Sequence, residues 1–272
     1  MLKFAQILPA LALLLLSSGL SGPVAAQSEP FRVEFRSGWQ MDNGNRMVAV
    51  HLHLAQGWKT YWRAPGDNGI PPSFDWDGSR NVKSVRFHWP RPNVYDVGGL
   101  QTIGYSTELV LPIEVMPVDP SQPVYLQAAV DLGVCSDICI PAHFEFKADL
   151  PDQGADDAAI RSALRKRPST AKEAGLRQIS CVIEPGSDGM QVTAQLDLPS
   201  TGGAETVVFE PGNPEIWVSE ADITRQGRSL VATVDMVALE GGAFALQRQD
   251  IIVTVLGKNR AVEIMGCPSV EN

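Results

Sequence analysis

The stretch Val134-Cys135-Ser136-Asp137-Ile138-Cys139-Ile140-Pro141 holds two of the four cysteines of this 272-residue chain. A fully extended chain advances about 3.3 to 3.6 Å per residue, so the Cα atoms of Cys135 and Cys139 would then lie about 13 Å apart. A disulfide needs them within about 7 Å, so bonding requires the three intervening residues to fold back. Strand-like patterns precede and follow this stretch, which places the pair at a turn between two strands.

Short segments of strand character, separated by Gly- and Pro-rich turns, extend over most of the chain. In 46–54, apolar and polar residues alternate so that His51 and His53 share one strand face. The pattern predicts an all-β chain of two antiparallel β-sandwiches. The expected strands are 46–54, 82–88, 108–115, 124–132 and 143–150, and then 179–183, 190–198, 206–210, 216–218, 230–236, 243–247, 251–256 and 261–265.

Composition changes after residue 150. The segment 156–167 begins with acidic residues, ends with basic ones and is followed by Pro168, an order that complements a helix dipole and then stops the helix. We therefore expect a first sandwich over 27–150, a linker with a short helix over 151–178, and a second, smaller sandwich over 179–272.

The first 26 residues have the features of a signal peptide. Lys3 supplies a positive charge, an apolar run follows, and Val24-Ala25-Ala26 fits cleavage before Gln27. The alternative is a membrane anchor, but the apolar run is well short of about 20 residues. No later stretch is long and apolar enough to span a bilayer, so we expect an exported mature chain without membrane insertion. The net charge of -9 and the lack of a Lys/Arg-rich run argue against nucleic acid as a partner.

Export favours disulfides, and position favours the pairs Cys135–Cys139 and Cys181–Cys267 among the three possible pairings. In the chain-entropy model, closing the loop of about five residues stabilises by about 2 kcal/mol, and closing the loop of about 87 residues by about 4.6 kcal/mol. The long-loop pair is therefore interpreted as a structural staple of the second sandwich. The short ring belongs to the class of strained or exposed disulfides that are readily reduced.

Two other interpretations of the short pair stay open. It is a plain hairpin clip, or it binds zinc or copper together with His143, although an oxidising compartment favours the disulfide over the metal. His51 and His53 are also candidate metal ligands, but two histidines without a third ligand do not establish a site. The sequence thus predicts no metal and no cofactor.

The stretch 130–141 resembles the redox hairpin of the N-terminal domain of DsbD, the bacterial thiol:disulfide interchange protein. Residues 103–115 resemble the strand entering the same sheet, and 57–62 with the loop after it look closer to the related copper-sensitivity protein ScsB. The resemblance implies an immunoglobulin-like periplasmic domain in which Cys135 and Cys139 exchange disulfides. In that family an aromatic cap loop covers the disulfide, which makes Tyr95 the candidate shield and Asp96 its acidic neighbour; the alternative for both is an ordinary turn residue.

The resemblance also implies partners, namely a membrane-embedded thiol reductase and thioredoxin-like periplasmic proteins. The sequence shows no electron-transferring membrane domain and no Cys-x-x-Cys domain, so we expect those parts on separate polypeptides. Oxidoreductase-type thiol:disulfide interchange is the expected activity. The alternatives are a non-catalytic binding or assembly module with a structural clip, and a copper-handling protein.

Overall fold

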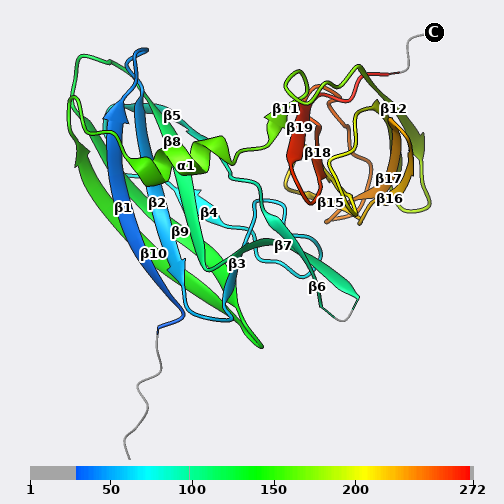
Figure 1. The fold of residues 1–272 in the computed structure, drawn as a ribbon, viewed down its shortest axis with the longest axis horizontal. Coiled ribbons are helices and arrows are strands. Elements are labelled where there is room, and N and C mark those ends of the chain that lie inside the picture. The colour runs from blue at the N-terminus through cyan, green and yellow to red at the C-terminus, as the bar shows by residue number, and fades with distance from the viewer. Residues whose placement is uncertain (1–28, 98, 270–272) are drawn as a thin grey trace, which may run out of the picture.

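The computed structural model describes residues 29–97 and 99–269, so the signal peptide expected at 1–26 lies outside the described residues. The described chain forms two β-sandwiches that lie side by side (Figure 1). Among the strands of the described residues, pairing is antiparallel except for the short contact of β11 with β19, and the expected all-β, immunoglobulin-like class is confirmed. Over the same residues, no helix combines the length and apolarity needed to cross a membrane.

The first sandwich packs a four-stranded sheet against a six-stranded one. The first sheet has the order β1 (Phe31–Gln40), β2 (Arg46–Leu54), β8 (Glu108–Pro117) and β5 (Val82–Phe87). The second has the order β10 (Cys139–Leu150), β9 (Val124–Cys135), β3 (Lys59–Tyr61), β7 (Leu100–Ser106) and β6 (Asn93–Val97), and β4 (Ser73–Asp75) pairs with β9. Inward-facing residues of both sheets build the core, among them Leu111, Ile113, Leu126 and Val130.

One residue carries the chain from one sheet to the other. Thr107 has a φ of 73°, in the left-handed region that L side chains rarely adopt. Its carbonyl accepts a hydrogen bond from the Leu54 backbone N–H at 2.8 Å, which holds this corner to β2. The segment 103–115, compared above with a single strand, is therefore two strands in different sheets, because the backbone turns at Thr107.

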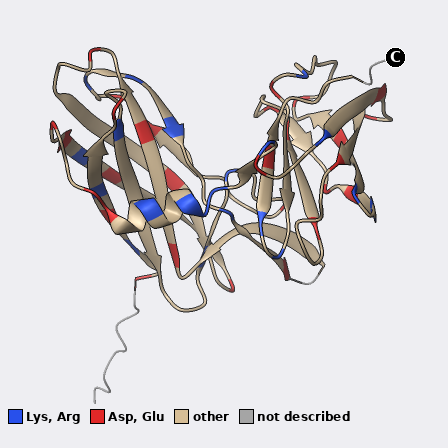
Figure 2. Cartoon of the chain, turned by 45° about the horizontal axis from the view of Figure 1, so that its top comes forward, with Lys and Arg blue, Asp and Glu red and all other residues tan. Residues whose placement is uncertain are grey.

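The short helix expected at 156–167 is present as α1 (Ala158–Arg165). Asp157 caps its start by accepting hydrogen bonds from two backbone N–H groups, and basic residues cluster at its end (Figure 2). The helix lies on the first sandwich, where Ile160 is fully buried against Met47 and Ala49 of β2. The part of β2 at Met47 and Ala49 is consequently covered on both faces, by the core on one and by α1 on the other.

The second sandwich also has two sheets. One has the order β11 (Ser169–Thr170), β19 (Ala261–Met265), β18 (Ile252–Leu256) and β14 (Thr206–Glu210). The other has β12 (Gln178–Pro185), β13 (Met190–Asp197), β17 (Ser229–Ala238) and β15 (Ile216–Val218), with β16 (Asp222–Gln226) paired to β17. The strand expected at 243–247 is wrong, because Phe244 and Leu246 pack against the core from irregular backbone.

The two sandwiches are in direct contact. Arg63, two residues beyond Tyr61 at the end of β3, forms ion pairs with Glu210 at 2.7 Å and with Glu263 at 2.6 Å. Leu256 and Ala261 of the second sandwich belong to the hydrophobic cluster of the first. Charged and apolar contacts together therefore fix the second sandwich against the end of β3.

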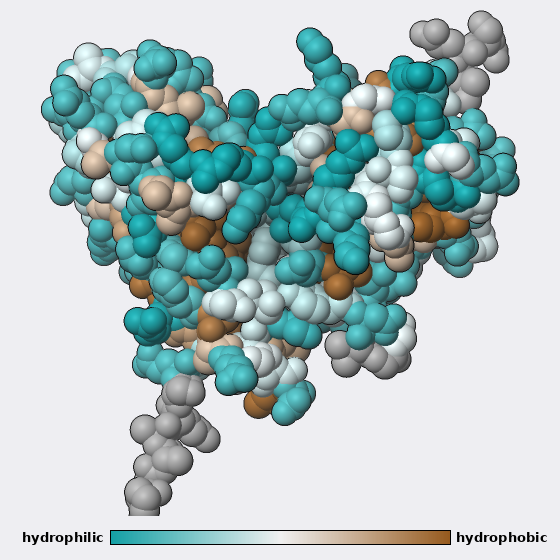
Figure 3. All heavy atoms as spheres, viewed as in Figure 1, coloured by the Kyte–Doolittle hydropathy of each residue, from teal (hydrophilic) through white to brown (hydrophobic). Residues whose placement is uncertain are grey.

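A cleft of about 600 Å³ lies between the sandwiches, and its lining includes the loop that follows β3 together with Phe209 and Trp217. The indole Nε1 of Trp217 donates a hydrogen bond to Asp67 in that loop at 3.1 Å. The face seen in Figure 3 is mainly hydrophilic, with scattered apolar side chains. The loop after β3 is thus held from the second sandwich as well as from the first.

Candidate redox site

The cysteine pair closes the tip of the long β9–β10 hairpin, at the lower end of the first sandwich in Figure 1. The two strands pair continuously up to Cys135 and Cys139, which lie directly opposite each other and are bonded, with their Cα atoms 4.1 Å apart. The backbone N–H of Ser136 donates to the carbonyl of Ile138 at 3.0 Å. The three residues between the cysteines fold back as the spacing required.

The two sulfur-bearing residues differ in accessibility. Cys135 is buried, with 7 % of its surface exposed, whereas Cys139 is exposed. Ile138, next to Cys139, is 67 % exposed and gives the tip an apolar side chain. Cys139 is therefore the more accessible residue of the pair.

A tyrosine that the sequence did not single out contacts both sulfurs. The hydroxyl of Tyr61 lies 2.8 Å from Cys135 Sγ and 3.3 Å from Cys139 Sγ. Burial raises the pKa of Tyr61, so the phenol keeps its proton at neutral pH and is the donor toward Cys135. In the sequence, Tyr61 is marked only as part of the stretch 57–62, quoted above for its similarity to ScsB. No local pattern links it to Cys135, because 74 residues separate the two.

The ring of Tyr61 fits against a glycine of the hairpin. A Cβ added at Gly133 would lie 3.0 Å from the Tyr61 ring and 2.7 Å from the Cβ of Ile70. Gly69 packs on the other side, since a Cβ there would also lie 3.0 Å from the ring. Residues 65–70 therefore form a cover over Tyr61, and glycine at position 133 leaves room for the ring beside the disulfide.

The same sheet brings a positive charge to this face. Lys59 pairs directly with Cys135 on one side and with Ser106 on the other. Directly opposite residues of antiparallel strands project to the same face, with Cβ atoms about 4.5 to 5.5 Å apart. The ammonium group lies 4.3 Å from the centre of the Tyr95 ring. A cation on this face favours the thiolate form of a neighbouring cysteine.

Tyr95 and Asp96, the expected shield and its neighbour, lie on β6, which is a strand of a hairpin. The Tyr95 hydroxyl donates to Ser106 Oγ at 3.1 Å, and Asp96 accepts the backbone N–H of Gly99 at 3.0 Å. Tyr95 thus contacts Lys59 and Ser106, and Lys59 in turn lies opposite Cys135. The aromatic residue that hydrogen-bonds the sulfurs is Tyr61.

Cys181 and Cys267 form the second disulfide, with Cα atoms 5.4 Å apart. It joins β12, the first long strand of the second sandwich, to the segment after β19, its last strand. Both residues are almost fully buried, at 1 % and 0 % exposure, within the second hydrophobic core. A reductant in solution reaches this bond far less readily than it reaches Cys139.

Residues 24–151 match the family model of the N-terminal domain of the thiol:disulfide interchange protein DsbD. The crystal structure of the N-terminal periplasmic domain of ScsB from Proteus mirabilis is also similar, with a TM-score of 0.65 and 26% sequence identity. That match covers 88% of this chain and 92% of the ScsB domain, so it includes the second sandwich. Among the curated proteins, none matches the chain. The first sandwich is thus similar to the DsbD N-terminal domain family, and the chain as a whole is similar to the ScsB domain.

Proposed function

We propose that this chain is a periplasmic thiol–disulfide exchange protein, with Cys135 and Cys139 as its redox pair. It would relay electrons between a membrane-embedded thiol reductase and thioredoxin-like periplasmic proteins. One observation carries the proposal: Cys139 is open to a partner, whereas Cys135 is buried beside a hydroxyl donor. The family match supports the chemistry, and the periplasmic origin of the ScsB domain supports the compartment.

The geometry assigns a role to each sulfur. The thiolate of a reduced dithiol partner attacks Cys139 Sγ and forms a mixed disulfide, while the Cys135–Cys139 bond breaks and its electron pair stays on Cys135. Tyr61 donates a hydrogen bond to the Cys135 thiolate as it forms, and Lys59 stabilises it electrostatically. The partner's second thiolate then attacks the partner's first sulfur in the mixed disulfide, which forms a disulfide within the partner and releases Cys139 as a thiolate. The partner leaves oxidised and this chain holds the two electrons. Oxidation by a substrate disulfide reverses the sequence.

Trapping tests this assignment. Cys135→Ala leaves Cys139 free to form a mixed disulfide that nothing within the chain resolves. Incubation with an oxidised thioredoxin-like protein should therefore give a covalent complex through Cys139, detected on a non-reducing gel and by mass spectrometry. Cys139→Ala, the matched control, should give much less complex because Cys135 is buried. Equal trapping by both variants contradicts the assigned roles.

The reduction potential of the native protein separates an exchange pair from a structural clip. We expect the Cys135–Cys139 bond to open against a thioredoxin-type reductant while Cys181–Cys267 stays closed. A potential below about -300 mV, or no trapping by either variant, would place the short pair with structural disulfides and refute the proposal.

A further inference from the structure

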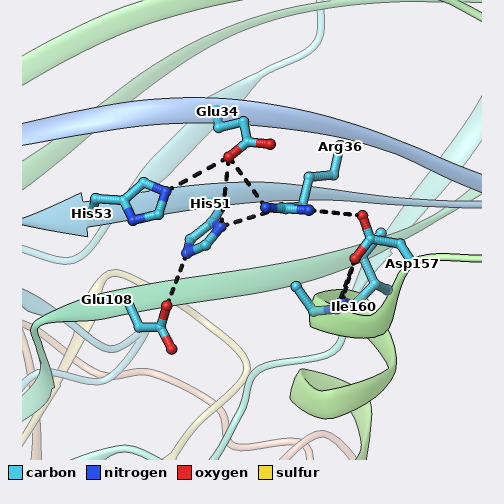
Figure 4. Close-up of polar contacts among 8 residues, drawn as sticks. Glu34, Arg36, His51, His53, Glu108, Asp157 and Ile160 are labelled. Carbon is cyan, nitrogen blue, oxygen red and sulfur yellow. Dashed lines mark hydrogen bonds and ion pairs between the residues drawn. The ribbon is translucent and has the colours of Figure 1, made fainter.

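The outer face of the β1–β2–β8 sheet carries a second group of chemistry-bearing side chains, separate from the cysteine hairpin (Figure 4). His51 and His53 lie on one face of β2, and Glu34 of β1 pairs directly with His51. One nitrogen of each histidine and one oxygen of Glu34 all lie within 4.8 Å of one another. The fold thus supplies the third ligand that the two histidines lack in the sequence.

The distances suit one shared ion after small side-chain rotations. Glu34 Oε2 lies 3.9 Å from His51 Nδ1 and 3.7 Å from His53 Nε2. Ligand atoms bound at about 2.0 to 2.2 Å in a tetrahedral zinc site are about 3.3 to 3.5 Å apart. The two distances from Glu34 therefore need to shorten by about half an ångström to match, and the side chains of Glu34 and His53 are partly exposed and free to move.

A further carboxylate orients the buried histidine. Glu108 of β8 lies 3.0 Å from His51 Nε2, on the side of the ring away from Glu34. With the proton held at Nε2 by Glu108, Nδ1 keeps its lone pair, which in this structure accepts from Arg36 and would otherwise be available to an ion. Metal-binding histidines commonly donate their other ring N–H to a carboxylate in this way.

A cationic side chain already binds two members of the group, Glu34 and His51. Arg36 donates from Nε to His51 Nδ1 and from Nη2 to Glu34 Oε2, both at 3.2 Å, and from Nη1 to Asp157 at 2.9 Å. Two of the three candidate ligand atoms therefore already bind a positive group. The bond to Asp157 gives the guanidinium a place to remain when it leaves the other two.

We propose that Glu34, His51 and His53 bind one divalent transition-metal ion of the zinc type, in competition with the Arg36 side chain. Two imidazoles and one carboxylate are ligands that suit Zn²⁺, whereas Mg²⁺ and Ca²⁺ prefer oxygen ligands alone. Three protein ligands leave a fourth position for water on the solvent side. The site joins β1 to β2 and does not depend on the redox proposal.

The test uses the oxidised protein, in which both disulfides are closed and thiolates do not compete for the ion. Titration with Zn²⁺ in a calorimeter should give one ion per chain, with a rise in Tm that Mg²⁺ does not produce. Glu34→Gln and His53→Ala should abolish binding, and Glu108→Gln should weaken it by about 10- to 100-fold. Arg36→Met should tighten it, because the competing cation is removed. His143→Ala, which removes another exposed histidine paired with a carboxylate, should leave binding unchanged.

Three results would overturn the proposal. The first is no saturable Zn²⁺ binding by the natural sequence, whether or not Arg36→Met binds. The second is binding that survives both Glu34→Gln and His53→Ala. The third is binding that Arg36→Met weakens, because Arg36 would then support the site and not compete for it.

Discussion

Replacing Tyr61 by Phe removes one hydroxyl and keeps the ring that packs on Gly133. The lost hydrogen bond joins two residues that are 6 % and 7 % exposed, so solvent screens it little. A hydrogen bond to a charged group contributes about 1.5 to 3 kcal/mol. At about 1.4 kcal/mol for each factor of ten, the acid dissociation constant of the Cys135 thiol should fall by about 10- to 150-fold. A poorer leaving thiolate should also slow reduction of the disulfide by a partner.

The measurement is a pH titration of thiolate ultraviolet absorbance in a Cys139→Ala background, where Cys135 is the thiol that titrates because Cys181 and Cys267 stay bonded. Stopped-flow reduction by a thioredoxin-type protein gives the matching rate in the two-cysteine form. Tyr95→Phe is the control, since its hydroxyl donates to Ser106. If Tyr61→Phe leaves the titration and the rate unchanged, or if Tyr95→Phe changes them as much, the assignment of Tyr61 as the thiolate donor is refuted.

Three further outcomes follow from charge, covalent linkage and burial. Lys59→Met should raise the pKa of the Cys135 thiol in the reduced protein, and added salt should reduce the difference between variant and parent; the same titration measures both. Replacing Cys181 and Cys267 together by Ala should cost about 2 to 5 kcal/mol in urea unfolding, while the rate of Cys139 reduction stays unchanged. In the second sandwich, Glu205 forms an ion pair with Arg225 at 2.7 Å and accepts hydrogen bonds from Thr201. Burial alone would raise the pKa of Glu205, but these hydrogen bonds outweigh it and lower the pKa below the usual 4.5. Its ion pair therefore stabilises fully above that pH and less as the pH falls below it, so Glu205→Gln should be less stable near pH 7 and lose less stability on acidification, by urea unfolding at both pH values.

The sequence located the cysteine hairpin because its signals are local. The residue pattern predicts strands before and after the pair, and a disulfide between Cys135 and Cys139 requires a tight turn of the three residues between them. Tyr61 and Lys59 reach the site through the register of β3 against β9, over more than 70 residues of intervening chain. Strand periodicity fixes which face a residue occupies but not which distant strand lies beside it, so both residues escaped prediction. Tyr95 was chosen by position relative to a family loop, and here that segment is a paired strand.

The strands of the fold show the same contrast between what local sequence predicts and what long-range pairing decides. The segment 46–54 matches β2 residue for residue, because its alternation reflects real pairing on both edges. At 243–247 the large residues Phe244 and Leu246 alternate with small or polar ones, yet this alternation records burial without pairing. Periodicity reports which side chains face a core, and only the tertiary structure decides whether a neighbouring strand is available for backbone hydrogen bonds.

Residues 61 to 63 perform two tasks within three consecutive positions. Tyr61 touches the sulfurs, Trp62 is fully buried, and Arg63 holds two glutamates of the second sandwich. Any reorientation of one sandwich against the other must displace residue 63, only two peptide units from the phenol, with a rigid indole wedged in between. The contact between the two sandwiches and the proposed redox tip therefore lie two residues apart in the chain, so a movement at one of them is transmitted to the other.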